Sequence, residues 1–227
     1  HSSSYGTLER WTSTQRATET REGIWQKTCN SCAYAYDTVT SPAVSEQTIV
    51  SSYKELQAAL AKGGKQWITL KKNSSENTWL YQEDMESDDM LVLEDPDADI
   101  TIDLNHCSVI RDTGRYDNAL FDIRQGKLRI FSTQLTGVPA NDWNMQFRSA
   151  AYTSCLFRVG KNGALHLTNI SGATPYQGMA YGQPMIISEG DLQIDGGHYR
   201  NMIDTFSPDK ETRGAAILID GGTAVIN

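Results

Sequence analysis

The residues best suited to holding a metal ion are Cys29 and Cys32, near the start of the chain. A Cys-x-x-Cys spacing can place two thiolates on one zinc ion, which takes four ligands in a structural site. This pair supplies half of such a site, so Cys29 and Cys32 form a candidate zinc site that needs further ligands. The alternatives are a disulfide staple between the two cysteines or two thiols in a small hairpin.

Acidic residues gather in two segments that the sequence predicts to be loops. In one of them carboxylates alternate with other residues, at Asp95, Asp97 and Asp99. Alternating carboxylates can coordinate calcium, which prefers oxygen ligands. The segment lacks the glycine and the distal glutamate of an EF-hand loop. The other interpretation of both acidic loops, this one and 83–89, is that they are solvated surface.

Two long insertions carry the residues best suited to binding an organic ligand. They run from Gly137 to Ser154 and from Ser171 to Gln183, and they are rich in aromatic, amide and glycine residues. This mixture combines rigid ring surfaces with adaptable hydrogen bonds. The other interpretation is that the rings fold back and cover the neighbouring strands. The candidate binding residues are Trp143, Tyr152, Tyr176, Tyr181, Asn141, Asn144 and Gln177.

The sequence contains no recognisable catalytic set. His106, His166 and His198 stand in different segments, and no nucleophile motif accompanies them. Hydrolysis of a glycoside needs two carboxylates that face one groove, and spacing alone does not establish such a pair. Cys107 and Cys155 lie in strand-like surroundings, which favours buried thiols. The sequence does not decide whether they form a disulfide with each other. The sequence therefore favours binding over catalysis.

The elements that must position these side chains come from a repeated phrase in the second half of the chain. Gly126, Gly163, Gly190 and Gly222 each open a copy, and apolar residues follow at the second and fourth positions after each glycine. That alternation predicts a strand with one buried face. A second apolar run precedes each glycine, so each unit is strand, turn, strand. The predicted common core contains Leu128, Ile130, Leu165, Leu167, Leu192, Ile194 and Ile226, with an adjoining wall of Leu120, Ile123, Leu156 and Val159.

One helix is predicted ahead of the repeats. Ser52 is its expected N-cap, and Glu55, three residues later, completes a capping box. Gly63 and Gly64 supply its C-terminal end. The helix has one apolar face, which suits it to cover the open end of a stack of strands.

Residues 1–45 differ in composition from the rest of the chain and are predicted to form a small module. They are rich in Thr, Ser, Arg and Glu, and Gly23 lies between strand-like runs at 11–19 and 24–28, which predicts a β-hairpin. A polar linker follows, and residues 46–227 are predicted to form the repeat domain. Because the chain ends within an apparent strand, we expect this domain to continue in a longer protein.

Charge and hydropathy exclude several classes of partner. The net charge of −8 argues against nucleic acid and anionic membranes, since phosphate binding needs clustered Lys and Arg. No segment approaches the roughly 20 apolar residues of a membrane span, so we expect no membrane insertion. Residues 1–4 lack the basic and apolar regions of a signal peptide, so a secreted protein would have been processed before this point.

The first module resembles a family of small cysteine repeats in surface proteins of Gram-positive bacteria. The resemblance rests on His1 and on the segments 17–23 and 27–32, which contain Gly23 and the two cysteines. In that family a cysteine usually stands at the position of Glu19 and a glycine at the position of Ala33. This sequence therefore lacks the family's third thiolate.

A cumulative pattern over residues 50–227 carries a second resemblance. It consists of the helix Glu-Leu-Gln-Ala-Ala-Leu, the strands at 68–70 and 100–105, and the Gly-x-Leu-x-Ile turns. It resembles the right-handed parallel β-helix, more narrowly the pectin-lyase-like domains of bacterial surface proteins and adhesins. The resemblance implies an all-β solenoid with a capping α-helix, with stacked apolar ladders inside and glycines in the tight turns. The alternative, a β-sandwich, also has many short strands but explains the glycine register less well.

Together the two resemblances imply an extracellular protein, secreted or attached to the bacterial cell wall. The function they imply is adhesion, in which the insertions bind a host glycan or a host protein. Two alternatives remain open: a polysaccharide lyase or glycoside hydrolase, and a structural spacer that lifts another domain off the surface. An enzyme would need acidic and basic side chains in one groove.

Overall fold

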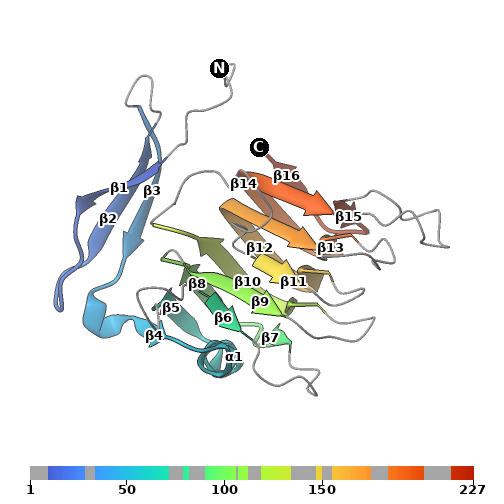
Figure 1. The fold of residues 1–227 in the computed structure, drawn as a ribbon, viewed down its shortest axis with the longest axis horizontal. Coiled ribbons are helices and arrows are strands. Elements are labelled where there is room, and N and C mark those ends of the chain that lie inside the picture. Colours follow the sequence, from blue (N-terminus) through green and yellow to red (C-terminus); the bar gives the residue numbers. More distant parts are fainter. Residues whose placement is uncertain are drawn as a thin grey trace.

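The computed structural model describes residues 10–28, 34–71, 79–81, 90–105, 107–111, 119–133, 147–149, 155–174, 184–201 and 216–227. Within them the chain is mostly β-strand with one α-helix, which confirms the predicted all-β class (Figure 1). The strands form a small antiparallel sheet near the N-terminus and a large parallel sheet. No helix in these ranges is long and apolar enough to cross a membrane.

The small sheet contains β1 (Arg10–Gln15), β2 (Gly23–Thr28) and β3 (Ala35–Ser41), in that order. β1 and β2 pair antiparallel, which confirms the predicted hairpin. β1 ends earlier than predicted, and the turn contains an isolated bridge between Thr18 and Arg21. β3 was not predicted from the sequence; it pairs antiparallel with β2 and completes a three-stranded sheet.

α1 (Tyr53–Lys62) confirms the predicted helix at both ends. The Ser52 hydroxyl accepts a hydrogen bond from Glu55 N at 3.2 Å, and Glu55 Oε2 accepts one from Ser51 N at 2.6 Å. Gly63 ends the helix with a φ of 64°, which favours glycine. The apolar face of α1 joins the main core through Tyr53, Leu56, Ala59 and Leu60.

The large sheet consists of three rows of parallel strands (Figure 1). The first row contains β7 (Leu91–Leu93), the starts of β10 (Phe121–Phe131) and β12 (Phe157–Thr174), β13 (Ile186–Ser188) and β15 (Ile217–Ile219). The second row contains β4 (Thr48–Val50), β5 (Lys65–Leu70), β8 (Asp99–Asp103), the middle of β10 and β12, the start of β14 (Asp191–Asn201) and β16 (Ala224–Ile226). The third row contains β6 (Trp79–Tyr81), β9 (Ser108–Arg111), β11 (Phe147–Ser149) and the ends of β12 and β14. A short 3-10 helix, η1 (Val44–Glu46), precedes β4.

Inward-pointing side chains stack in register along the rows. In the second row Ile102, Ile130, Leu167 and Ile194 are successive partners, and all four are buried. All of the predicted core and wall residues except Ile226 lie in the same buried cluster. The repeated phrase therefore does build one continuous core.

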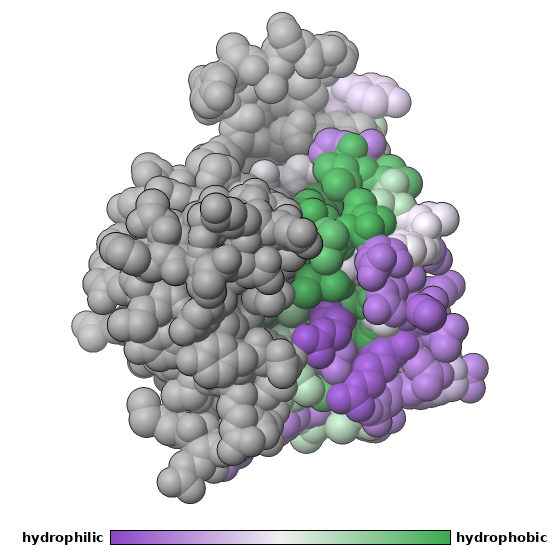
Figure 2. All heavy atoms as spheres, turned by 90° about the vertical axis from the view of Figure 1, so that its right-hand side faces the viewer, coloured by the Kyte–Doolittle hydropathy of each residue, from purple (hydrophilic) through white to green (hydrophobic). Residues whose placement is uncertain are grey.

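The prediction for Ile226 was wrong, because this side chain is 56% exposed. Its register is as expected, since it pairs with Ile194, but no described residue packs on the other side of β16. Leu218, Ile219 and Val225 are also exposed, and they form an apolar patch over β15 and β16 (Figure 2). At the other end of the rows Val50 and Leu91 are buried, because α1 packs in the same cluster, so an inward position of an edge strand needs a covering element to be buried.

The glycines that open the repeated phrase serve the turns between the first and second rows. Gly126 and Gly222 have φ values of 76° and 66°, a region that favours glycine. Gly163 has an ordinary φ, but a side chain at this position would collide with the carbonyl oxygen of Ile123. The predicted role of these glycines is confirmed.

The small sheet packs on the outer face of the second row. Trp11 of β1 and Trp67 of β5 both contact the buried ring of Phe131 edge-on, with ring centroids 5.7 and 5.4 Å apart. Beside them, Arg129 Nη2 lies 3.3 Å from Asp37 Oδ2 of β3. This contact leaves the outer face of β12 and β14 as the neighbouring surface to consider for function.

Candidate functional site

The third-row strands end beside one another, and the first-row strands begin beside one another. Arg111 pairs with Ser149, and Thr174 pairs with Asn201. In the first row, the first residues of β7, β10, β12, β13 and β15 are register partners of one another. The segments 82–89, 112–118, 150–154, 175–183 and 202–215 therefore all leave and re-enter the sheet at the edge between these rows. We call this the connector edge.

The seven predicted binding residues lie outside the described residues. Tyr152 belongs to the segment 150–154, and Tyr176, Gln177 and Tyr181 belong to 175–183, so both of these segments attach at the connector edge. Asn141, Trp143 and Asn144 belong instead to 134–146, which joins the second row to the third row at a different corner. The attachment points thus divide the seven residues into two groups.

The predicted boundaries of the two insertions were wrong. The insertion from Gly137 to Ser154 contains the strand β11, because Phe147 pairs with Val109 on one side and with Gly172 on the other. The second insertion begins after Thr174, since 171–174 belong to β12. Short strands of the third row were hidden in what the sequence presented as long loops.

Acidic and basic side chains meet along the first row and just after its strands β7 and β10 reach the turn to the second row. Arg124 Nε donates to Asp122 Oδ2 at 2.8 Å, and Arg124 Nη1 also pairs with Glu94. Arg158 is the register partner of Asp122 on the neighbouring strand. Burial raises the pKa of Asp122, and the charge of Arg158 opposes that change. We call these four residues the first-row cluster.

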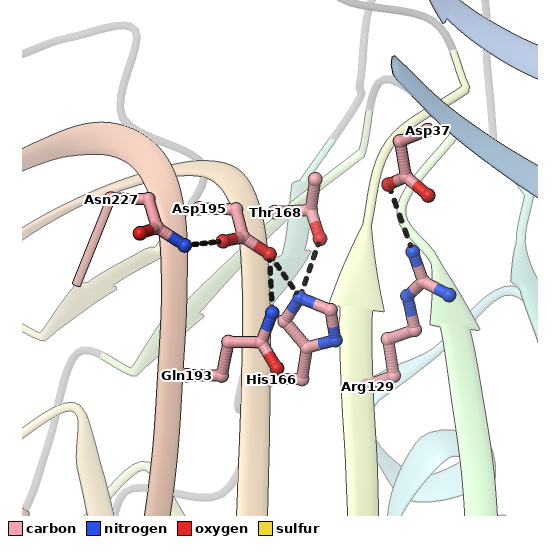
Figure 3. A network of polar contacts seen from close by, with 7 residues as sticks. All are labelled: Asp37, Arg129, His166, Thr168, Gln193, Asp195 and Asn227. Carbon is pink, nitrogen blue, oxygen red and sulfur yellow. Dashed lines mark hydrogen bonds and ion pairs between the residues drawn. The ribbon is translucent and has the colours of Figure 1, made fainter. Parts of the chain in front are cut away.

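A second polar network lies on the outer face of the second row (Figure 3). The carboxylate of Asp195 accepts hydrogen bonds from His166 Nε2 at 2.6 Å, Gln193 Nε2 at 2.8 Å and Asn227 Nδ2 at 2.7 Å. Burial raises the pKa of Asp195, but these three donors and the charge of His166 outweigh burial and hold the pKa below its usual value. Asp195 is therefore ionised and fixes side chains from neighbouring strands. We call this set the Asp195 network.

The geometry of the Asp195 network does not fit a nucleophilic triad. The hydroxyl of Thr168 lies 3.3 Å from His166 Nε2, the same nitrogen that contacts Asp195. In a triad the base uses one ring nitrogen for the carboxylate and the other for the nucleophile. Because an ionised carboxylate can only accept, His166 Nε2 carries a proton and cannot take one from Thr168. The network therefore contains no activated hydroxyl.

The candidate calcium site is not formed by the predicted residues. Asp95 Oδ2 accepts from Gly64 N at 2.7 Å, and Asp95 Oδ1 accepts from Asp97 N at 3.0 Å. Asp97 and Asp99 are exposed. The described part of the chain contains no group of three His, Cys, Asp or Glu residues that could hold a metal ion. Asp95 instead stabilises the turns near the end of α1.

Two of the four cysteines lie in the part of the chain that the structure describes. Cys107 and Cys155 are buried thiols, as the surroundings favoured, and the disulfide between them that the sequence left open is not formed. Cys29 and Cys32 lie outside the described residues, so zinc at this pair stays a prediction. Its check is the metal content of the purified protein, before and after substitution of either cysteine.

The sequence contains a signal for part of the Asp195 network. Alignment of the copies on their opening glycines places Arg129, His166 and Gln193 at the same position of the phrase. The structure confirms that these three residues are neighbours across β10, β12 and β14. The aligned copies do not reveal that Asp195 collects the hydrogen bonds, because that depends on side-chain conformations.

Comparison with known proteins finds no matching family model, no matching curated protein and no matching solved structure.

Proposed function

We propose that residues 46–227 fold as a right-handed parallel β-helix and that the chain is an adhesin-like binding protein of the bacterial surface. The parallel pairing and the order of the rows support the fold, since from β7 onward the chain visits the first, second and third rows in turn. Right-handed crossovers are the rule for connections between parallel strands. Residues 1–45 form a separate module in this proposal, and the protein is secreted or attached to the cell wall.

The observation that carries the binding function is the connector edge. Consecutive parallel strands lie about 4.8 Å apart, so segments attached at register partners are neighbours along the stack. Two of these segments contain Tyr152, Tyr176, Tyr181 and Gln177. In repeat proteins insertions on one face often form the binding surface. The ligand is a host glycan or a host protein, held by tyrosine rings and amide groups.

A triple variant tests this function. We expect Tyr152→Ala, Tyr176→Ala and Tyr181→Ala together to abolish binding of any ligand found in a glycan and host-protein screen. Each ring at a true hot spot contributes about 2 kcal/mol or more, which corresponds to a loss of more than tenfold in affinity per residue. Binding is measured by calorimetry after circular dichroism has shown that the variant is folded.

Two controls make the outcome specific. Tyr34→Ala removes an exposed tyrosine from the small module, so it should leave affinity unchanged. Trp143→Ala addresses the other corner of the stack and shows whether the ligand reaches beyond the connector edge. Full affinity in a folded triple variant would remove the connector edge as the binding surface and favour the spacer function.

The first-row cluster favours a second candidate function, a polysaccharide lyase or glycoside hydrolase. Asp122, Glu94, Arg124 and Arg158 bring acidic and basic groups together along one row. An enzyme of this class predicts new reducing ends or unsaturated products from a polysaccharide panel, with activity lost in Asp122→Asn. The contacts within the cluster support the alternative that these charges stabilise the row, which predicts no product.

A further inference from the structure

The contact between the small sheet and the large sheet combines aromatic packing with buried polar atoms that lack partners. We propose that the small sheet is a movable cover, which undocks from the outer face of the second row while both sheets stay folded. The docked arrangement is the closed state, and the undocked arrangement is the open state. This motion concerns the second row and not the connector edge, so it is independent of the proposed binding function.

Side chains rather than strand pairing join the two sheets. No described strand of the small sheet pairs with a strand of the large sheet. The buried part of the contact consists of Trp11 and Val39 from the small sheet and Phe131 from the large sheet. This cluster is separate from the main core, to which the small sheet contributes no residue. Undocking therefore breaks no strand pairing and leaves the main core packed, and relative motion is the usual behaviour of units joined in this way.

The connection between the sheets lets the small sheet move as a unit. Its hairpin turn is bonded to η1, because Val44 N donates to Thr18 O at 2.9 Å. The chain then passes through Gln47 into β4. The side chain of Gln47 accepts a hydrogen bond from Thr69 Oγ1 of β5 at 2.8 Å, close to the point where the chain crosses. Figure 1 shows the small sheet beside the rows and joined to them at one end, so this sheet and η1 can pivot about Gln47.

The closed state buries two donors that have no acceptor. Trp11 Nε1 and Arg129 Nε are both buried, and no described atom accepts a hydrogen bond from either of them. Arg129 also pairs with Asp37 of the small sheet through Nη2 (Figure 3), but both side chains are part-exposed and such pairs stabilise little. A buried donor without an acceptor costs more than one ordinary hydrogen bond contributes. Undocking gives both donors access to water, which favours the open state.

Aromatic packing favours the closed state. Phe131 is completely buried although it lies on the outer face, and Trp11 meets its ring edge-on. In the open state this ring and that of Trp67 become accessible beside Arg129, whose Cζ lies 5.7 Å from the centroid of the Phe131 ring. The balance between the packed rings and the buried donors sets the fraction of molecules that are open.

Labelling of an introduced thiol tests the proposal. Val39→Cys places a thiol inside the contact, at a position that is 4% exposed in the closed state. A bulky maleimide reaches this thiol only when the small sheet lifts off. We expect it to react at least about a hundredfold faster than the native thiol of Cys107, which lies in the main core and reacts only when that core opens. Mass spectrometry of the peptides assigns each modified site.

Two further substitutions, each combined with Val39→Cys, shift the balance in opposite directions. Arg129→Met removes a buried donor and keeps the apolar stem, so it should slow labelling about tenfold, although it also removes the weak link to Asp37. Phe131→Ala removes the packed ring, so it should accelerate labelling about tenfold or more. The matched control is Arg124→Met, which changes an arginine of the first-row cluster outside the contact and should leave the rate unchanged.

Amide hydrogen exchange separates undocking from unfolding of the small sheet. β2 is the central strand of that sheet, so its amides should stay protected during the openings that expose the introduced thiol. Labelling as slow as that of Cys107 would overturn the proposal, and so would amides of β2 that open together with the thiol. Unchanged or faster labelling after Arg129→Met would also overturn it, because the buried donors would then not favour the open state.

Discussion

At the scale of single residues, two aspartates of the second row, Asp195 and Asp103, each accept several hydrogen bonds. Asp195 collects donors from three side chains on the outer face. Asp103, which is buried, accepts from Thr133 N at 2.9 Å, Thr133 Oγ1 at 2.8 Å and Asn105 N at 3.0 Å. Burial raises the pKa of Asp103, although these three hydrogen bonds oppose that change. Asp103 joins the ends of β8 and β10, whereas Asp195 faces solvent.

The lowered pKa of Asp195 predicts a specific dependence of stability on pH. A carboxyl whose pKa is lower in the folded state stabilises the protein above its unfolded value, which is near 3.8. That contribution is lost as the pH falls through the lower folded value. We expect Asp195→Asn to reduce the free energy of unfolding at pH 7 by about 1–2 kcal/mol. Urea denaturation from pH 7 to pH 2 should show the difference from wild type shrinking below about pH 4.

The matched control for that experiment is Asp191→Asn, which changes an exposed aspartate on the same strand. Asp191 accepts one hydrogen bond, from Thr223 Oγ1 at 2.7 Å, at an exposed position. Surface changes of this kind typically alter stability by less than about 0.5 kcal/mol. If Asp195→Asn destabilised the protein equally at every pH, the stabilisation would not come from its charge.

At the scale of elements, the sequence predicted those whose signals are local. The capping residues of α1 and the glycines of the repeated phrase act within a few residues of their own position, and both were identified. β3 and β11 were missed. β3 has a mostly polar sequence, and β11 is only three residues long, so their pairing partners rather than their own patterns define them. The local pattern of apolar and polar residues does not determine which distant segments pair.

The core ladder gives the element-scale prediction. Leu165 lies between Leu128 and Leu192 in the second row and is buried. We expect Leu165→Ala to lower the free energy of unfolding by about 2–5 kcal/mol, because it removes buried methyl groups and leaves a cavity between two neighbouring rungs. Urea denaturation measures the change, and Lys161→Ala serves as the exposed control on the same strand. A cost near zero would mean that the ladder does not pack as described.

At the scale of the whole molecule, aromatic packing rather than charge holds the small sheet on the large one. The ion pair between Asp37 and Arg129 has side chains about one-third exposed, and such pairs contribute roughly 0–1 kcal/mol. The edge-on contact of Trp11 with Phe131 contributes about 0.5–1.5 kcal/mol beyond the burial of its area, and Val39 and Trp25 of the small sheet pack in the same cluster. The aromatic contacts therefore dominate this interface.

The candidate site could be predicted from sequence only in part. Residue types identified the aromatic insertions, but their attachment to the sheet depends on β11, so Trp143 was grouped with tyrosines that attach at a different corner. The same limit applies to Ile226. Its pattern matches the other inward residues, but burial depends on neighbours that the pattern does not contain.

We propose that the aromatic connectors of consecutive turns of the chain form one exposed binding edge. A crystal structure of this chain that resolves 150–154 and 175–183 tests it most directly. We predict that the rings of Tyr152, Tyr176 and Tyr181 lie on the same edge with their faces accessible to solvent. Rings packed against the rows, or placed on opposite sides of the stack, would contradict the claim.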